Sequence, residues 1–519
     1  MRCALLLIFV VTLGVVLRVP RLNVRPVHGD EAVHAYKFNE LWTGKGYQYD
    51  PHEYHGPTLN YSTLPFLWLR GAGDYSQVDI ALFRFVPVLF GLGLVLLLPL
   101  VADGLGRWAA LAAGVLTAVS PLMVFCSRHY VQETLLVFFV FAVIALGWRF
   151  ARTRRPIWAV LAGLAAGLAH ATKETCVIAF AALLAALLGP WLWQRFVRRV
   201  PAAVRRPFPW RPLLSGAAAA VVISVVLFSA FFTHWKGSWD SIRTFSTYFE
   251  RGVGGSVHDH PWDYYLRMLL YTHYAPGPVW SEALIVVLAA AGMAAALFGK
   301  GPGDARPAFV RFLAVYTLLM VLVYSALPYK TPWSMLGMLH GLILLAGVGA
   351  VSLLRRLKHL PFQVPVALLL LAVTAQLGVQ SYRTNLDPRF VTDTRNPYVY
   401  AQPLRGVVLM GSFVERLAAA HPDGRAMLVK VIMPNAWPVP WYLRRLEAVG
   451  YWEDPPLDCD APVIVTATDA PAGLEDRLNG AYERFSYGLR ADVTIVVYVN
   501  TDLMDRFRAA ERAAAGEGK

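Results

Sequence analysis

Long apolar runs separated by short polar loops make up most of the first 380 residues. A helix that crosses a bilayer needs roughly 20 mostly apolar residues. Eleven runs come near this length, and each predicts a spanning helix: 3–20, 80–101, 108–126, 133–149, 157–172, 174–193, 213–233, 279–298, 309–327, 333–353 and 361–380. The first run could instead be a cleaved signal peptide, but only Arg2 precedes its apolar part and no small-x-small cleavage site follows it.

The hydrophobic pattern changes after residue 380. Strand-like and helical runs alternate in this tail, at 407–420, 427–433, 441–448, 463–467 and 493–499. Such alternation is typical of a small α/β domain. The pattern therefore predicts an all-α polytopic membrane domain over 1–380, followed by an α/β domain over 381–519.

Composition agrees with a membrane protein. Apolar residues make up 56% of the chain and charged residues only 16%, and the mean hydropathy is +0.46. Soluble domains have roughly 25% charged residues. The net charge of +14 could indicate a nucleic-acid partner, but the first 379 residues carry about +16 and the rest about −2. Because the excess lies mostly in short loops between apolar runs, it indicates membrane topology and no nucleic-acid binding.

Basic residues gather in four of these loops. They are Arg149, Arg152, Arg154 and Arg155; Arg195, Arg198, Arg199, Arg205, Arg206 and Arg211; Lys300, Arg306 and Arg311; and Arg355, Arg356 and Lys358. Eleven helices with a cytoplasmic N-terminus put all four loops in the cytoplasm, as the positive-inside rule requires. We therefore expect a multi-pass plasma-membrane protein with three larger segments outside, at 20–79, 234–278 and 381–519.

Three arginines just after the first run, Arg18, Arg21 and Arg25, go against the positive-inside rule. One explanation is that they face the anionic phosphates of lipids. The other is that their side chains snorkel to the membrane interface, as long basic side chains commonly do.

The first outside loop contains the densest group of reactive side chains. They are His28, Asp30, Glu31, His34, Tyr36 and Lys37. A carboxylate near the bilayer surface can take a proton from a hydroxyl, and neighbouring cations or a metal can stabilise a departing phosphate. The alternative is structural, because Asp30 could simply cap a helix that runs over 31–42.

Acids and cations recur at the predicted outer ends of later runs. Arg128 and Glu133 flank the start of the run at 133–149, and Lys173 and Glu174 lie between two runs. An acid that enters an apolar helix usually faces a cavity or a partner. Glu133 could therefore belong to a site, or it could form a structural ion pair with Arg128 or Lys173.

Two more positions lie on the same predicted face. His55 follows in the first outside loop, and Lys330 lies in the segment 328–333 beside a helix break. Lys173 and Lys330 could bind phosphate as point charges, or they could snorkel to the interface. A group made of His258, Asp259 and His260, with Glu133 as a further candidate, could hold a divalent metal or form a polar turn.

The ordered motifs resemble those of the GT-C glycosyltransferases, specifically the protein O-mannosyltransferases and their bacterial relatives that modify lipid A. Asp30-Glu31 matches the acidic pair of the first outside loop, and 55–57 loosely matches a His-Pro-Pro-like turn. The segments 127–135 and 167–173 match later family segments, although Glu133 stands where Asp is commoner. The segments 28–32, 172–174, 329–333, 396–400 and 441–443 look most like the prokaryotic flippase-activity-associated Agl subgroup.

The resemblance implies an inverting hexosyltransferase, mannosyltransferase-like, that uses a polyprenyl-phosphate sugar at the extracytoplasmic face. The acceptor would be a protein or a lipid-linked glycan. Asp30 would be the base, and Arg128, Lys173 and Lys330 would bind the donor phosphate. Glu31 and Glu133 would orient groups or hold a possible divalent metal. Further substrate-binding candidates are His28, His34, Tyr36, Lys37, His55 and Glu174.

Two other functions fit the same residues. A flippase or transporter of polyprenyl-linked glycans would explain charges within the membrane, and it would show two related halves around a mid-membrane site. A non-catalytic accessory protein of cell-envelope glycan assembly would use the acids only for structure. A transferase would show a cavity lined by Asp30, Arg128, Glu133 and Lys173.

Overall fold

The chain divides into two compact units in the computed structural model. The structure describes residues 2–52, 55–71, 73–192, 209–251, 255, 258–299, 301–468 and 473–516. The helical unit comprises Met1–Leu22, Glu40–Phe66 and Ala81–Tyr400. The sheet unit comprises Asn23–Asn39, Leu67–Ile80 and Ala401–Lys519. The boundary expected at 380/381 falls inside a helix, and two segments of the first predicted loop group with the tail instead.

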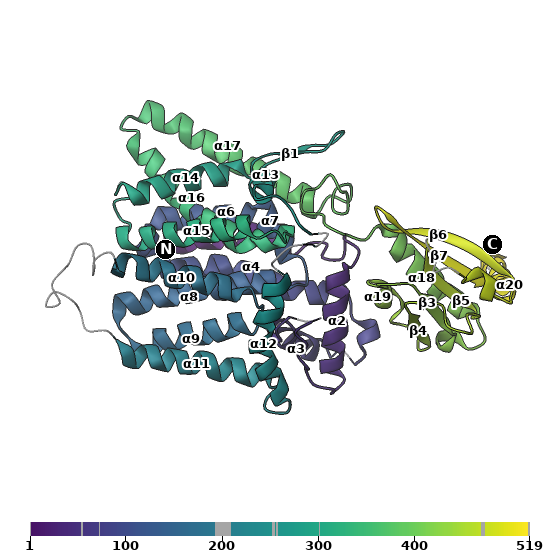
Figure 1. Ribbon diagram of the computed structural model, residues 1–519. Helices are drawn as coiled ribbons and strands as arrows, with labels where there is room; N and C mark the ends of the chain where they lie inside the picture. The colour runs from purple at the N-terminus through teal and green to yellow at the C-terminus, as the bar shows by residue number, and fades with distance from the viewer. Residues whose placement is uncertain are drawn as a thin grey trace. The chain divides into compact units, whose positions relative to one another are not determined.

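The helical unit is a bundle of apolar helices (Figure 1). Its helices are α1 (Arg2–Arg18), α3 (Thr58–Arg70), α4 (Ile80–Leu97), α5 (Ala102–Leu105), α6 (Arg107–Val119), α7 (Pro121–Ser127), α8 (Glu133–Thr153), α9 (Pro156–His170), α10 (Cys176–Leu192), α11 (Trp210–Phe228), α12 (Trp235–Arg251), α13 (Tyr264–Leu270), α14 (Ala283–Leu297), α15 (Pro307–Ala326), α16 (Leu336–Arg356) and α17 (Leu360–Asn385). The unit also has 3₁₀ segments η2 (Leu98–Val101) and η5 (Pro332–Met335) and a ribbon of β1 (Thr272–His273) and β2 (Val279–Trp280).

Each of the eleven predicted runs contains a helix in the residues described, although the end of one run, 229–233, forms a turn, and the chain is a multi-pass membrane protein. Six helices are long and apolar enough to span: Ile80–Leu105, Glu133–Thr153, Trp210–Phe228, Pro307–Ala326, Pro332–Arg356 and Leu360–Asn385. Four apolar helices are shorter, at Ala4–Arg18, Pro156–His170, Cys176–Gly189 and Ala283–Leu297. That these four also cross the membrane stays a prediction.

The run at 108–126 is broken into α6 and α7, which bend by 61° and together could form a seventh span. Pro121 opens α7 and cannot donate a helical hydrogen bond. The side chain of Ser120 caps α7 by accepting a hydrogen bond from the backbone N–H of Met123. Local sequence therefore explains a break that the hydropathy of the run conceals.

Close helix packing in the bundle depends on small residues. Helices α14 and α16 pack together at Gly292 and Gly349. A Cβ atom on either glycine would collide with a backbone carbonyl of the facing helix. Small residues let helices approach closely where the surrounding lipid supplies no hydrophobic driving force between them.

Basic loops meet at one end of this bundle, which we call the basic end. Asp103 forms ion pairs with Arg149 and Arg152, and Asp304 pairs with Arg355. Because α8 and α16 each end there, their first residues lie at the opposite end, which we call the loop end. Figure 1 shows α12 running across the loop end of α8 to α11. In the second basic group, Arg195, Arg198, Arg199, Arg205 and Arg206 lie outside the described residues.

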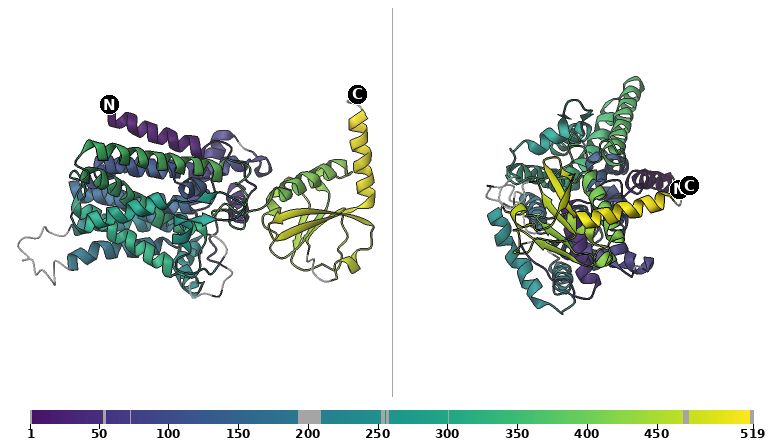
Figure 2. Two further views of the ribbon diagram at one scale, coloured as in Figure 1. Left: turned by 90° about the horizontal axis from the view of Figure 1, so that it is seen from above. Right: turned by 90° about the vertical axis from the view of Figure 1, so that its right-hand side faces the viewer.

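The sheet unit contains a five-stranded mixed sheet with strand order β4-β3-β5-β7-β6. Its strands are β3 (Val429–Ile432), β4 (Val449–Trp452), β5 (Val463–Ala467), β6 (Tyr482–Arg490) and β7 (Val493–Asn500). Its helices are α2 (Gly29–Trp42), α18 (Arg405–Ala420), α19 (Val439–Leu443) and α20 (Thr501–Gly516), with 3₁₀ segments η1 (Tyr75–Gln77), η6 (Gly424–Ala426) and η7 (Glu475–Arg477). Figure 2 shows the sheet with α18 and α20 beside it.

Alternation along the central strands produces two apolar faces in this sheet. Val463 and Val465 of β5 point into the larger core, with side chains of α18 and α20. Ile464, between them, packs into a smaller cluster on the other face with Cys459. A strand that is buried on both faces has a continuous apolar sequence. The tail contains both helices and a sheet, as the sequence predicts.

Candidate functional site

Two adjacent acids at the start of α2 lie in opposite environments. Glu31 is fully buried, and its Oε2 accepts a hydrogen bond of 3.0 Å from the backbone N–H of His28. A glutamate that bonds back to the residue before its helix is the acidic half of a capping box. The carboxylate of Asp30 is 51% exposed and lies 3.9 Å from Nδ1 of His28. Glu31 is therefore the capping acid, and Asp30 is the acid that solvent and substrate can reach.

The segment that leads into Asp30 is held by the C-terminal part of the chain, within the sheet unit. The backbone N–H of Val27 donates a 2.7 Å hydrogen bond to the hydroxyl of Tyr442. The amide Nε2 of Gln402 donates to the carbonyl of Pro26 at 2.8 Å. A Cβ atom built on Gly29 would lie 3.8 Å from Cβ of Trp437. These contacts fix the backbone on which Asp30 sits.

The other candidates on α2 differ in their exposure. His28, His34 and Lys37 are buried, so they contribute to the packing of α2 in this conformation. Tyr36 is 43% exposed. Of these four candidates, Tyr36 is the one that a ligand can reach without a rearrangement.

Lys173 and Glu133 form a buried ion pair at the loop end of the helical unit. Burial alone lowers the pKa of Lys173, but the carboxylate of Glu133 raises it overall, so the ammonium stays charged. The other oxygen of Glu133, Oε2, is buried and has no hydrogen-bond partner among the described residues. The pair thus offers both a cation and an acceptor with spare capacity.

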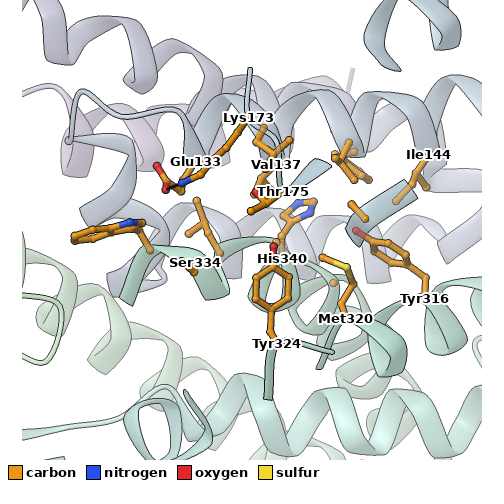
Figure 3. Close-up of a pocket in the computed structure, with 18 of the residues that line it drawn as sticks. Glu133, Val137, Ile144, Lys173, Thr175, Tyr316, Met320, Tyr324, Ser334 and His340 are labelled. Atoms are coloured by element: carbon orange, nitrogen blue, oxygen red, sulfur yellow. Dashed lines mark hydrogen bonds and ion pairs between the residues drawn. The ribbon is translucent and has the colours of Figure 1, made fainter. Parts of the chain in front are cut away.

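A narrow slot extends from this ion pair between α8, α10, α15 and α16. Figure 3 shows Glu133 and Lys173 near one end of it and Ile144 and Tyr316 toward the other. The distance from residue 133 to residue 144 along α8 is about 16 Å at 1.5 Å per residue. Most of its lining is apolar: Leu136, Val137, Val140, Phe141, Ile144, Ala179, Met320, Leu336 and Leu344. The slot is lined by Glu133 and Lys173 as expected, but Arg128 does not line it, and Asp30 belongs to the sheet unit.

His55 and Glu174, both predicted to bind substrate, bind each other. Nδ1 of His55 lies 2.7 Å from Oε2 of Glu174, and the hydroxyl of Tyr49 donates to Oε1 at 2.7 Å. Burial by itself raises the pKa of Glu174, but the charge and hydrogen bond of His55 and the hydrogen bond of Tyr49 lower it to about 2. The network fastens the loop that contains Tyr49 and His55 to the turn before α10.

Backbone contacts strengthen the same attachment. The N–H and hydroxyl of Thr58 both donate to the carbonyl of Ala171, at 3.0 and 2.7 Å. A Cβ atom on Gly56 would collide with that carbonyl, so the loop approaches the turn as closely as only glycine permits. Because Lys173 and Glu174 share this turn, the loop also determines where Lys173 lies.

Two predicted phosphate ligands make structural contacts instead. Arg128 is buried, and its guanidinium donates to the carbonyls of Arg18, Pro20 and Arg21 at 2.6 to 2.9 Å. The ammonium of Lys330 donates to the carbonyls of His260 and Leu327. Buried cations satisfied by backbone carbonyls stabilise chain turns, and in this conformation neither of them points its charge into the slot.

Arg18 is also a structural residue. It is fully buried, and its guanidinium donates to the carbonyls of Thr117 and Ala118 at 2.7 and 2.8 Å and to Ser127 at 3.3 Å. Neither lipid contact nor snorkelling explains it, so both predictions are wrong for this residue. The last carbonyls of α6 lack partners within the helix, and Arg18 satisfies two of them. Its position outside the positive-inside rule is explained by this contact.

The four metal candidates are not brought together. Within the residues described, no three His, Cys, Asp or Glu side chains gather as a metal site would require. His258 bonds to the hydroxyl of Tyr400, His260 stacks on Tyr264 with ring centroids 4.1 Å apart, and Asp259 accepts from Gly255. Glu133 is paired with Lys173. The structure therefore favours the polar-turn interpretation of 258–260 over the metal site.

Sequence reasoning missed two buried polar residues of the helical unit. Glu282 accepts hydrogen bonds from Ser120, from the N–H of Leu122 and from the hydroxyl of Tyr398. It lies in the first residues of an apolar run, so the rule applied to Glu133 could have found it. His340 lines the slot from the second turn of α16, and a histidine inside an apolar run was the available signal.

The sequence and the structure match known proteins. Residues 8–235 match the family model described as dolichyl-phosphate-mannose-protein mannosyltransferase. The crystal structure of ArnT from Cupriavidus metallidurans bound to undecaprenyl phosphate is 16% identical with a TM-score of 0.62, and the match covers 94% of this chain and 97% of that chain. The Archaeoglobus fulgidus oligosaccharyltransferase, tethered with an acceptor peptide containing the NVT sequon, is 12% identical with a TM-score of 0.54, over 94% of this chain and 74% of that chain. No curated protein matches the sequence significantly.

The chain is a multi-pass membrane protein with the fold of ArnT and of the Archaeoglobus fulgidus oligosaccharyltransferase. It is a mannosyltransferase-like glycosyltransferase, related through residues 8–235 to the dolichyl-phosphate-mannose-protein mannosyltransferases. The predicted enzyme class and the resemblance to that family are confirmed.

The His55–Glu174 network predicts a specific acid response. Because the folded protein lowers the pKa of Glu174 from its ordinary value of 4.5 to about 2, this carboxylate stabilises the fold above that ordinary value. The contribution is lost as the pH falls from about 4.5 through about 2, and it is on the order of 3 kcal/mol at most. In acid unfolding followed by tryptophan fluorescence in detergent, Glu174→Gln should flatten the stability curve in this range.

The matched control for this experiment is Asp50→Asn, in the same loop, where the carboxylate accepts a hydrogen bond from the N–H of His52. It should keep the steep acid limb of the parent. An unchanged limb in Glu174→Gln would contradict the assignment of the network.

Proposed function

We propose that this chain transfers a sugar, in one inverting step, from a polyprenyl-phosphate donor to a protein or lipid-linked glycan at the extracytoplasmic face of the plasma membrane. The donor class is supported by the family match at residues 8–235 and by the undecaprenyl phosphate bound to ArnT, which shares this fold. The motifs at 28–32 and 329–333 support a place in the Agl subgroup.

The observation that carries this proposal is the different use of the two adjacent acids. Glu31 is consumed by the cap, whereas Asp30 is exposed at a helix N-terminus on a backbone held by Tyr442 and Gln402. In the proposed step the carboxylate of Asp30 takes the proton of the acceptor hydroxyl. The acceptor oxygen bonds to the anomeric carbon as the bond from that carbon to the phosphate oxygen breaks, and the polyprenyl phosphate leaves.

Lys173 is our candidate for holding the phosphate of the donor. Its charged ammonium lies at one end of an apolar slot, and a phosphate would replace or share the contact that Glu133 now makes. The apolar lining of the slot suits the first units of a polyprenyl chain. A cation placed at the departing phosphate stabilises charge as it develops.

Asp30→Asn keeps the size of the side chain and removes its basicity, so transfer from a labelled polyprenyl-phosphate mannose should slow by about 10²–10⁴-fold. Binding of undecaprenyl phosphate should not change. Glu40→Gln, on the same helix, is the control and should transfer at the parental rate. Parental transfer by Asp30→Asn, or no transfer by the parent to any peptide or lipid-linked glycan, would contradict the proposal.

Replacement of Lys173 tests its proposed contact with the donor phosphate. Lys173→Met alone leaves the carboxylate of Glu133 buried without its partner, which typically costs 3–5 kcal/mol and could unfold the protein. The double variant Lys173→Met/Glu133→Gln removes both charges, and we expect it to keep the parental melting temperature within a few degrees.

Binding of undecaprenyl phosphate to the double variant, measured in nanodiscs, should weaken by at least about tenfold, because a charge-assisted contact is lost. Lys45→Met removes an exposed cation of the same unit and should bind as the parent does. Equal binding by the double variant and the parent would exclude Lys173 as the phosphate ligand.

A further inference from the structure

Exposed and half-buried aromatic side chains gather on the sheet unit around the middle of α2. Tyr36 is 43% exposed and Tyr451 is 44% exposed. The ring of Trp437 meets that of Tyr36 edge to face, with centroids 5.9 Å apart. We call Tyr36, Trp437 and Tyr451 the aromatic platform. It combines residues from α2, from the loop before α19 and from β4, an edge strand of the sheet.

A partly buried fourth ring, that of Tyr75, lies near the platform. Burial, together with the nearby hydroxyls of Tyr36 and Tyr451, raises the pKa of Tyr75 against the opposing charge of Arg444. The side chains of Tyr36 and Tyr451 are thus near enough to Tyr75 for their charges to act on it. Tyr75 packs edge to face on Trp441, with centroids 6.0 Å apart, and the guanidinium of Arg444 lies 3.8 Å from the centre of the Trp441 ring.

The loop that carries Trp437 is also fastened to the sheet. Nη2 of Arg490 donates a 3.0 Å hydrogen bond to the carbonyl of Trp437. A flat ring that is already held in place loses little conformational entropy when a ligand stacks on it. The platform is thus preorganised for contact.

The platform lies on the same helix face as the residue next to the proposed base. Gly29 and Tyr36 are seven residues apart, two turns of α2, and both contact Trp437. Two helical turns are about 11 Å. A short chain of linked rings over Tyr36 could therefore extend toward Asp30 without leaving the sheet unit.

We propose that the aromatic platform binds a sugar ring of the acceptor, and that the acceptor is consequently a glycan. This proposal rests on the proposed function, because it takes Asp30 as the base. Tyrosine and tryptophan rings offer an apolar face to the C–H side of a sugar ring and a polar edge to its hydroxyls. The exposed carboxylates of Glu453 and Asp454, which follow β4, can accept further hydrogen bonds from sugar hydroxyls.

These acids also argue against a lipid surface as the occupant. Anionic headgroups attract basic segments, and the exposed carboxylates of Glu453 and Asp454, two and three residues after Tyr451, would repel them. A peptide would be expected to pair its backbone with the edge strand β4, but this strand has only four residues, and Tyr36 and Trp437 are not on it. A polyhydroxylated ring uses the rings and the carboxylates together.

The test measures glycan binding without the donor. The full-length protein in phosphatidylcholine nanodiscs is titrated with linear trisaccharides of mannose, of glucose and of N-acetylglucosamine, and binding is followed by saturation-transfer NMR. At least one trisaccharide should bind, and Tyr36→Ala and Tyr451→Ala should each weaken its affinity by about tenfold, the scale of one lost aromatic contact. Tyr274→Ala, which removes an exposed ring of the helical unit, should bind as the parent does.

The same titration in Asp30→Asn separates this proposal from the proposed function. Binding that persists in Asp30→Asn while transfer is lost supports both. If Asp30→Asn binds the trisaccharide and also transfers sugar at the parental rate, the platform proposal stands and Asp30 is not the base. The platform proposal is overturned if no trisaccharide binds, if Tyr36→Ala and Tyr451→Ala bind as the parent does, or if these two variants instead lose binding of a serine- and threonine-containing peptide.

Discussion

The position of Asp30 depends on a clamp between the two ends of the chain. Tyr442 and Gln402 hold the backbone of Val27 and Pro26 across sequence separations of 415 and 376 residues. An exposed carboxylate can serve as a base only if its backbone holds it in one place, because small displacements of a reacting group are costly. The C-terminal segment is thus part of the framework that carries the proposed base, as well as a domain that follows the membrane helices.

Buried cations of the helical unit are satisfied in two different ways. Arg18 and Arg128 donate to backbone carbonyls where helices end, and this satisfies carbonyls that would otherwise lack partners. Lys173 is different, because its partner is the carboxylate of Glu133 and its charge lies at an apolar slot. A cation that donates to several backbone carbonyls stabilises the chain at that place. A cation that is hydrogen-bonded to one carboxylate can instead bind a phosphate in place of that carboxylate.

The local hydrophobic pattern predicted the helices well, because a run of apolar residues indicates a helix whatever tertiary contacts that helix makes. It also named Lys173, together with Arg128, as a possible partner of Glu133, since all three stand at the ends of apolar runs. It could not tell Asp30 from Glu31: which acid caps α2 depends on where the helix begins. Nor could it predict that residues 23–39 join the sheet unit, because the hydrogen bond from Val27 to Tyr442 leaves no periodic signal in either segment.

The central claim is that the sheet unit holds the base in its working position, and Tyr442→Phe tests it most directly. This change removes the hydroxyl that accepts the hydrogen bond of the Val27 N–H, at a cost of about 1–3 kcal/mol when a buried donor loses its partner. Tyr482→Phe removes a hydroxyl that bonds to Asp460 elsewhere in the same unit and is the control. In a transfer assay, Tyr442→Phe should lower kcat by about tenfold with the donor KM unchanged, while Tyr482→Phe keeps both constants. Parental kcat in Tyr442→Phe, or an equal loss in Tyr482→Phe, would contradict the account.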